Sequence, residues 1–373
     1  MIRVMNVISD TNIGGAGRVL LNYLRYADRS RFELLAALPR GSMLQAPLEE
    51  AGALAYEVDG IADRSWSRAG MGALKKLFRE TRPDLVHTHG CLSGRMAARN
   101  CGIPVVYSRH SAFPVPARLR YPPGRWVNKL VNERCADRII AVSPAARDNL
   151  VQGGVSPNKI TVVMNGTAPV PQTSEEERAA LREELSIPPG AVVFGILARL
   201  EDYKGHLYLV EAVRLLMERG REDFTVLAAG TGPFEEELAR AVQKAGVGDR
   251  LRLLGFRSDV AALLNILDVQ LNCSYGTEAT SMALLEGMSL GLPSIASDYG
   301  GNPWVVEDSR TGLIFPSRDA AALADAMERL TDRPEERQAM GRRARERYEN
   351  SFTGEAFAKN TESIYLDILK GAK

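Results

Sequence analysis

The chain has 373 residues and a net charge of +1, with 45% apolar and 25% charged residues, as is typical of a folded globular protein. It contains no apolar run near the roughly 18 residues of a membrane span, and its start lacks the parts of a secretory signal peptide. We therefore expect a cytoplasmic protein, and the length, about twice that of an average domain, predicts two domains.

Charge is distributed unevenly along the chain. Lys and Arg outnumber Asp and Glu by ten in residues 1–170, whereas Asp and Glu outnumber Lys and Arg by nine in the rest. A basic first domain can attract a phospholipid surface, a polyprenyl phosphate or nucleic acid, although solvated charge without a binding role is equally consistent.

The cysteines lack any C-x-x-C spacing, which favours reduced, packed thiols over a disulfide framework or a zinc site.

Short β-branched runs alternate with helical patterns along the chain, which is typical of doubly wound α/β domains with parallel strands. In the first domain, strands are predicted at 2–9, 32–38, 54–58, 85–89, 104–110, 138–143 and 160–165. Helices are predicted at 17–28, 43–51, 70–81, 92–100, 125–134 and 144–151.

A proline-rich stretch near residue 170 precedes an acidic helix that Ser174 can cap, so we place the linker there. Strands are then predicted at 191–200, 224–230, 250–255, 269–274, 293–298 and 312–316. We expect two Rossmann-like doubly wound α/β domains, 1–170 and 171–350, facing across a cleft, and a C-terminal helix, 351–373, packing back toward the first. Ligands of open α/β sheets bind at the carboxyl ends of the strands.

A glycine-rich stretch, NIGGAGRVLLNYL, follows the first predicted strand. Gly14, Gly15 and Gly17 can let the backbone approach an anion at the start of a helix. The spacing is not that of a dinucleotide fingerprint, so a tight turn without a ligand is the alternative.

Three of the four histidines, His87, His89 and His110, lie at predicted strand ends. Because strand ends form the ligand-binding edge in this architecture, we expect at least some of them to face a ligand. Each of them alone is equally consistent with a hydrogen-bonded structural group.

The second domain has two candidate anion-binding loops. Arg199 ends a strand, and Lys204 follows five residues later before a glycine that opens a helix. An Arg fork and a Lys point charge beside a helix N-terminus can bind a diphosphate without a metal. The turn Gly230-Thr231-Gly232 gives a second close backbone approach, or a plain turn.

The stretch YGTEATSMALLEGMSL places Glu278 and Glu286 eight positions apart. We predict a helix capped by Thr280 or Ser281 and reaching about Leu290, with the two carboxylates about 12 Å apart by helix rise. Vicinal hydroxyls donate to carboxylates, so this pair suits a sugar and a ribose at the two ends of a diphosphate, with the amides of 279–282 toward the phosphates.

Together these motifs resemble the family 4 glycosyltransferases of the GT-B fold, and the resemblance runs from GGAGR through the E-x7-E motif to SDYGGNP. It implies transfer of a sugar from a nucleotide donor with retention of configuration. The implied catalytic residues are Glu278, His110, Arg199 and Lys204. The implied donor-binding residues are Gly15, Ala16, Arg199, Lys204, Gly230, Thr277, Glu278, Ala279, Thr280, Ser281 and Glu286. The implied acceptor-binding residues are Gly14, His87, His89, Arg109 and His110.

One residue departs from the family pattern: Trp304 stands where the family usually has Glu. The chain also lacks the D-x-D motif of metal-dependent glycosyltransferases of another fold, so we expect no metal and no other cofactor. The leaving phosphate oxygen can take the acceptor proton, and Arg199, Lys204 and helix-end amides can stabilise the departing charge.

A basic, aromatic stretch, SRHSAFPVPARLRYPPGRWVNKL, follows the strand that ends near His110. We expect this stretch to contact an anionic or membrane-borne acceptor at the inner face of a membrane, and not nucleic acid. A solvated loop is the alternative.

A nucleotide-sugar epimerase of similar architecture and a noncatalytic anion-binding module remain as alternative functions of the protein. A dehydrogenase is disfavoured because the glycine fingerprint is absent.

Overall fold

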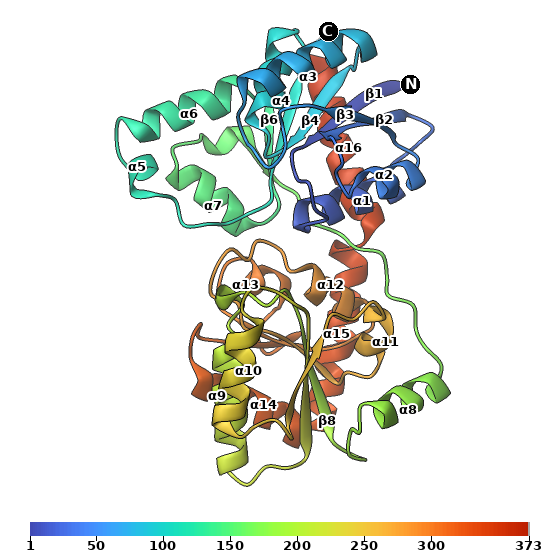
Figure 1. Cartoon of the computed structure of the whole chain (residues 1–373), viewed down its shortest axis with the longest axis vertical. Helices are drawn as coiled ribbons and strands as arrows, with labels where there is room; N and C mark the ends of the chain where they lie inside the picture. The colour runs from blue at the N-terminus through green and yellow to red at the C-terminus, as the bar shows by residue number, and fades with distance from the viewer. Residues whose placement is uncertain (372–373) are drawn as a thin grey trace. The chain divides into compact units, whose positions relative to one another are not determined.

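A computed structural model describes residues 1–371, and the chain divides into two units with separate cores. Unit 1 comprises Met1–Thr167 and the chain from Phe352 onward, and unit 2 comprises Ala168–Ser351. Figure 1 shows each unit as a sheet covered by helices. Residues 372 and 373, the end of the expected segment 351–373, lie outside the described residues. None of the described helices is long and apolar enough to cross a membrane.

Unit 1 contains a seven-stranded parallel sheet in the order β3-β2-β1-β4-β5-β6-β7. Its strands are β1 (Ile2–Ile8), β2 (Phe32–Pro39), β3 (Leu54–Val58), β4 (Leu85–His89), β5 (Val105–Arg109), β6 (Arg138–Ala141) and β7 (Ile160–Val162). Central strands such as β1 and β4 are almost continuously buried, as expected for a sheet covered on both faces.

The helices of unit 1 come from both ends of the chain. They are α1 (Gly15–Tyr26), α2 (Gln45–Glu50), α3 (Arg68–Thr81), α4 (Leu92–Asn100), α5 (Ala117–Arg120), α6 (Gly124–Arg134), α7 (Pro144–Gln152) and α16 (Gly354–Gly371), with a 3-10 turn at Pro157–Lys159. The C-terminal helix α16, red in Figure 1, lies among the blue elements of unit 1. Its Tyr365 is fully buried and packs edge-on against Tyr23 of α1, with ring centroids 6.1 Å apart.

Unit 2 contains a six-stranded parallel sheet in the order β10-β9-β8-β11-β12-β13. Its strands are β8 (Val192–Leu197), β9 (Phe224–Ala229), β10 (Leu251–Gly255), β11 (Val269–Asn272), β12 (Ser294–Ser297) and β13 (Gly312–Phe315). Its helices are α8 (Glu175–Glu184), α9 (His206–Glu218), α10 (Glu235–Ala245), α11 (Val260–Asn265), α12 (Met282–Ser289), α13 (Asn302–Val305), α14 (Ala320–Asp332) and α15 (Pro334–Ser351), with a 3-10 turn at Asp202–Lys204.

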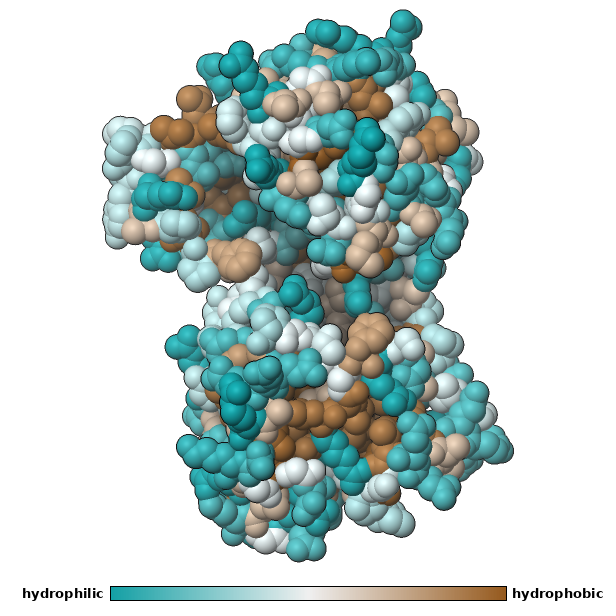
Figure 2. All heavy atoms as spheres, viewed as in Figure 1, coloured by the Kyte–Doolittle hydropathy of each residue, from teal (hydrophilic) through white to brown (hydrophobic). Residues whose placement is uncertain are grey.

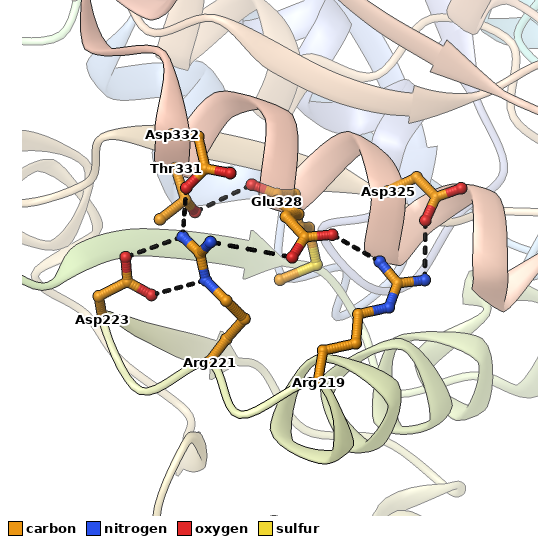
Figure 3. Close-up of polar contacts among 8 residues, drawn as sticks. Arg219, Arg221, Asp223, Asp325, Glu328, Thr331 and Asp332 are labelled. Carbon is orange, nitrogen blue, oxygen red and sulfur yellow. Dashed lines mark hydrogen bonds and ion pairs between the residues drawn. The ribbon is translucent and has the colours of Figure 1, made fainter.

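Polar contacts support the packing of unit 2 away from its strand ends. Arg219, just after α9, donates to Asp325 and Glu328 of α14 over 2.8 and 2.7 Å (Figure 3). Arg221 lies in the same network and donates to Asp332 over 2.5 Å. Such a network joins two helices that are distant in sequence.

The structure confirms the predicted fold class, because both sheets are parallel and covered by helices. Each predicted strand is present, with ends up to about three residues shorter. For example, β7 stops at Val162 instead of continuing to 165, and Ser174 caps α8 through a capping box with Glu177. The short helix α5 was not predicted.

Candidate active site

In each unit the order of the strands reverses at one point of the sheet. In unit 1 this point falls between β1 and β4, and in unit 2 between β8 and β11. Loops diverge at such a point, and ligands of open α/β sheets bind beside it. The glycine loop follows β1 and His89 ends β4, whereas Arg199 and Lys204 follow β8 and Glu278 follows β11. The predicted residues therefore lie at the expected ligand-binding edge of each sheet.

A glycine holds the loop after β8 against the end of β11. Gly205 has a φ of +75°, and a Cβ atom there would lie 2.0 Å from the carbonyl oxygen of Cys273. Only glycine fits this left-handed, crowded position. In addition, the amide of Tyr275 donates to the carbonyl of Tyr203 over 2.8 Å. These contacts bring Lys204 beside the loop that follows β11.

The carboxylate of Glu278 is buried and receives three hydrogen bonds at one oxygen. Its Oε2 accepts from Lys204 Nζ at 2.8 Å, from Ser274 Oγ at 2.9 Å and from Asn272 Nδ2 at 3.4 Å. The side chain of Glu278 is 7% exposed and that of Lys204 22%. Charge-assisted bonds to a buried carboxylate are strong. From the sequence we expected Lys204 to contact the diphosphate and Glu278 to contact the sugar of the donor. In the structure the two side chains also contact each other.

A Gly-Gly turn supports the backbone of this carboxylate. The amide of Gly301 donates to the carbonyl of Glu278 over 3.0 Å. A Cβ atom at Gly300 would lie 2.0 Å from the Glu278 carbonyl, and one at Gly301 only 1.5 Å from the Ala279 carbonyl. Thr277 has a φ of +49°, which is unusual for a β-branched residue and is typical of functional loops.

Arg199 is the most exposed of the predicted site residues in unit 2. Its side chain is 72% exposed and makes an ion pair of 2.7 Å with Glu201. Because exposed ion pairs contribute little free energy, Arg199 can exchange Glu201 for an anionic ligand. The neighbouring Gly230 has a φ of +148°, and its Cβ would lie 1.9 Å from the carbonyl of Ala198. The two predicted anion-binding loops therefore lie side by side.

Helix α12 begins where the sequence predicts. Its first residue is Met282, and Ser281, one of the two predicted caps, accepts a hydrogen bond from an amide three residues later at 3.4 Å. Glu278 thus precedes the helix by four residues. The estimate of about 12 Å between Glu278 and Glu286 applied the helix rise to residues 278–281, which precede the helix, and the distance stays a prediction. Glu286 lies on α12 and is half-buried.

Trp304 lies on α13, directly after the Gly-Gly turn, and is 50% exposed. Its carbonyl accepts a hydrogen bond of 2.7 Å from Arg347. The chain therefore presents an exposed aromatic ring at the position where the family pattern has a carboxylate, while the backbone of this turn is fixed.

In unit 1 the glycines of the first loop have different roles. Gly14 precedes α1, and the amides of Gly15 and Ala16 lie in the first helical turn, where no helical acceptor is available. A Cβ atom at Gly15 would meet nothing within 4 Å, whereas one at Gly17 would lie 2.8 Å from the side chain of Leu44. Packing therefore accounts for Gly17, which corrects the prediction that it lets the backbone approach a ligand.

His87 is a structural group in this arrangement. It is 3% exposed, with Nδ1 at 2.6 Å from the hydroxyl of Tyr365 and Nε2 at 2.7 Å from that of Ser108. Burial, and then the charge of His110, lower the pKa of His87 to about 3. Both ring nitrogens have protein partners, which favours the structural alternative for His87. A contact of His87 with an acceptor stays a prediction.

His89 and His110 form a hydrogen-bonded, stacked pair. His89 Nδ1 lies 2.9 Å from His110 Nε2, and His89 Nε2 lies 3.4 Å from Asn6 Oδ1. The ring centroids are 5.1 Å apart. Burial lowers the pKa of His89 well below its usual range and, with the charge of Arg109, lowers that of His110 to about 4. Both rings are therefore neutral near pH 7.

Arg109 is held within unit 1. Its Nε donates to the carbonyl of Ser111 over 3.1 Å, and its Nη2 donates to Asn149 Oδ1 over 3.3 Å. Ser111 lies in the basic stretch after β5, whereas Asn149 lies on α7. A direct contact of Arg109 with an acceptor stays a prediction.

Sequence reasoning missed several polar partners of these residues. Asn272 and Ser274 end a buried strand, and Asn6 is a lone amide inside an apolar one, so a search for polar residues in apolar strands could have found them. Tyr365 gave no such signal. Within residues 1–371, no group of three or more His, Cys, Asp and Glu side chains is arranged to hold a metal ion.

Two family models match the chain: Glycosyltransferase Family 4 over residues 13–169 and Glycosyl transferases group 1 over residues 177–347. The UDP-Gal:alpha-D-GlcNAc-diphosphoundecaprenol alpha-1,3-galactosyltransferase of Escherichia coli is 28% identical over 310 residues, covering 80% of this chain and 79% of that protein. The D-inositol 3-phosphate glycosyltransferase of Corynebacterium efficiens is 29% identical over 303 residues, covering 76% of this chain and 71% of that protein.

Solved structures agree in fold. A glycosyltransferase from Rickettsia africae matches with a TM-score of 0.87, 20% identity and 99% coverage of both chains. Anabaena Alr3699/HepE, solved in complex with UDP-glucose, matches with a TM-score of 0.84 and 20% identity, covering 98% of this chain and 100% of that one. The alternative functions, an epimerase and a noncatalytic module, find no support among these relatives. The chain is therefore a glycosyltransferase of family 4, with the two Rossmann-like domains of the GT-B fold.

Proposed function

We propose that this glycosyltransferase moves a sugar from a nucleoside diphosphate donor to an acceptor hydroxyl, retains the anomeric configuration and needs no metal ion. The observation that carries the proposal is the buried Glu278 carboxylate, bonded to Lys204 at the strand-order reversal of unit 2. A carboxylate that is fixed in this way accepts hydrogen bonds from sugar hydroxyls. The adjacent cation and glycine turns suit a diphosphate.

In this proposal the donor diphosphate binds to unit 2. Arg199 leaves Glu201 and binds the phosphates in a fork, and Lys204 contributes its remaining N–H groups as a point charge. The amides at the start of α12 add partial positive charge. These fixed groups stabilise the negative charge that develops on the diphosphate as the glycosidic C–O bond breaks, which is the main contribution to catalysis.

The acceptor oxygen forms the new bond to the anomeric carbon on the face that the diphosphate leaves. Its proton passes to the departing phosphate oxygen, so no side-chain base is required. A double-displacement route would need a carboxylate nucleophile on the opposite face. In unit 1, Asp10 lies beside the glycine loop, where its Oδ2 atom would be 3.8 Å from a Cβ atom at Gly14. It is the residue on which a covalent adduct would form in that route.

The acceptor is proposed to be lipid-linked and presented at the inner face of a membrane. The E. coli relative is named for an acceptor that carries diphosphoundecaprenol. In this chain, α6 exposes Trp126, Val127 and Leu130 to solvent at 64%, 57% and 55%. Their spacing places them on one face of the helix. Figure 2 shows strongly hydrophobic residues on the surface of unit 1 over α6.

Cations surround this apolar face. Arg118, Arg120 and Arg134 are exposed, whereas Arg125 and Lys129 are bonded to the carbonyl of Gln152 and to Glu133. An apolar face beside free arginines is complementary to an anionic lipid surface, because it combines insertion with attraction to headgroups.

The donor assignment is tested with a panel of nucleotide sugars that starts with UDP-galactose and UDP-glucose. A bound donor raises the melting temperature by mass action, and slow hydrolysis of the sugar reports turnover. We expect one donor to act in both assays on the wild type and to lose its thermal shift in Arg199→Ala. The exposed-pair variant Arg240→Ala is the control and should keep the shift. A panel without any shift or turnover would contradict the proposal.

The membrane assignment is tested by sedimentation with vesicles of phosphatidylcholine alone or with phosphatidylglycerol. We expect binding to the anionic vesicles at low salt, and its loss in Trp126→Ala/Leu130→Ala. Trp66, which is 54% exposed on another part of unit 1, provides the matched control Trp66→Ala. Equal sedimentation with both vesicle types, or no binding at all, would remove the membrane contact.

A further inference from the structure

We propose that Asn6 and His89 are positioning residues that fix the tautomer of His110 and thereby keep its Nδ1 atom as a hydrogen-bond acceptor for a substrate hydroxyl. The three residues belong to β1, to β4 and to the position after β5, which are neighbours in the sheet of unit 1. The identity of the hydroxyl rests on the proposed function. The tautomer itself follows from the protein alone.

The chain of hydrogen bonds starts at a group with a fixed role. The carbonyl of Leu35 can only accept, and Asn6 Nδ2 donates to it over 3.4 Å. This bond sets the orientation of the Asn6 amide, which is fully buried. The Asn6 Oδ1 atom must therefore face His89, and it too can only accept.

The remaining roles follow in order. Because Asn6 Oδ1 accepts, the Nε2 atom of His89 carries the hydrogen. A neutral imidazole carries one hydrogen, so His89 Nδ1 is an acceptor, and the contact of 2.9 Å requires His110 Nε2 to donate to it. The Nδ1 atom of a neutral His110 is then left with a lone pair.

The surroundings keep the imidazole rings of His89 and His110 neutral, with one N–H hydrogen each. Burial disfavours the imidazolium form of His89 and His110, and the neighbouring Arg109 disfavours it further at His110. The His87 ring, with its centroid 4.4 Å from that of His89, adds a third buried imidazole that resists a positive charge.

The lone pair of His110 lacks a partner in the protein. Within the part of the chain that the structure describes, its Nδ1 atom is buried and has no hydrogen-bond partner. An unpaired buried acceptor is unfavourable, and a ligand that brings a hydrogen removes the penalty. A sugar or acceptor hydroxyl supplies that hydrogen, whereas a phosphate dianion or a carboxylate does not. The geometry therefore selects a hydroxyl.

Nitrogen-15 NMR of the whole chain tests the tautomer directly. The chain has only four histidines, so single substitutions assign every ring. Without any substrate at pH 7, we expect His89 and His110 both to carry hydrogen on Nε2 and not on Nδ1. Hydrogen on Nδ1 of either ring, or an imidazolium at His110, would overturn the proposal whatever the enzyme does in activity assays.

A matched pair of variants then separates positioning from structure. Asn6→Leu removes the acceptor of His89, and we expect the His110 signal to shift toward the Nδ1–H form with an approximately tenfold loss of turnover, the equivalent of one hydrogen bond. Ser108→Ala removes a similar buried bond from His87 and should leave the His110 tautomer unchanged. An unchanged His110 tautomer in Asn6→Leu would refute the role of Asn6. If the wild type shows the tautomer but uses no sugar nucleotide, the proposed function fails instead.

Discussion

Lys204 Nζ lies 2.8 Å from Glu278 Oε2, although 74 positions separate the two residues in the sequence. The contact forms because the loops after β8 and β11 leave the sheet of unit 2 side by side. It gives a nearly buried carboxylate its counter-charge and leaves other N–H groups of the lysine available. One ion pair thus links the proposed phosphate-binding and sugar-binding groups.

Removal of Lys204 is therefore expected to affect both groups. Lys204→Ala leaves the Glu278 charge buried with only neutral donors, and we expect donor binding to weaken by about 1.5–3 kcal/mol in titration calorimetry. Glu278→Gln keeps the shape and should lower kcat more than affinity. Arg240→Ala, from an exposed helix pair, is the control with unchanged binding. Wild-type kinetics in both site variants would refute the assignment.

The Gly-Gly turn below Glu278 should tolerate no side chain. Gly301→Ala places a Cβ atom 1.5 Å from the Ala279 carbonyl, so the turn must move, and we expect loss of donor binding together with a fall in the free energy of unfolding of more than about 2 kcal/mol. A Cβ at Gly248 meets nothing within 4 Å, which makes Gly248→Ala the control, within about 0.5 kcal/mol of wild type. Urea unfolding measures both, and equal effects would contradict the prediction.

Buried histidines make the free energy of unfolding depend on pH. The pKa of His206 and that of His110 are lowered to about 4 and that of His87 to about 3, mainly by burial. The unfolded chain, with ordinary histidine pKa values near 6.5, therefore binds more protons below that pH. Their contribution is complete above about pH 7 and is lost as the pH falls through 6.5 toward 4.

We expect each such histidine to lower the free energy of unfolding by about 2 kcal/mol between pH 7 and pH 5. His206 is 1% exposed, and neither ring nitrogen has a hydrogen-bond partner among the described residues, so it suits a test. His206→Leu should show a shallower pH dependence than wild type in urea titrations. An identical slope in the two proteins would contradict the pKa assignment of His206.

Metal independence is tested by chelation. We expect transfer to continue in excess EDTA, because Arg199, Lys204 and the helix-end amides supply the positive charge at the leaving diphosphate. Loss of activity that Mg²⁺ or Mn²⁺ restores, and that Ca²⁺ or Na⁺ does not, would refute this expectation.

The stereochemical outcome distinguishes the proposed route from its rivals. We expect the product to keep the anomeric configuration of the donor, as the proton NMR coupling constant of the first-formed product will show. An inverted product would rule out same-face transfer. A covalent glycosyl adduct on Asp10, detected by mass spectrometry, would be compatible with retention but would overturn the direct route.

The sequence predicted the elements of both sheets because alternating apolar runs and turn residues are local signals. It also placed polar site residues at strand ends, because LVHTH and ARLEDYK change there from apolar to polar residues. It did not predict which polar groups meet. The bonds from His87 to Tyr365 and from Lys204 to Glu278 span 278 and 74 positions.

Other errors arose where tertiary packing overrides a local pattern. Gly17 was assigned to a ligand because it lies in a glycine-rich loop, but its neighbour is the Leu44 side chain. At Thr277 the backbone adopts a left-handed conformation that the sequence did not indicate. Neither the Leu44 contact nor this backbone conformation has a signature within a short window of sequence.

The position of α16 also sets an order for synthesis on the ribosome. Unit 2 is one continuous segment, and the last helix of unit 1 is translated after all of it. Until then the first 167 residues lack Tyr365, the partner of His87, and Glu362, which accepts from the Asp28 amide over 2.8 Å. Domains generally fold as units. A chain that ends before α16 contains every residue of unit 2 but lacks part of unit 1. A stop codon before α16 would therefore damage the beginning of the protein and spare its middle.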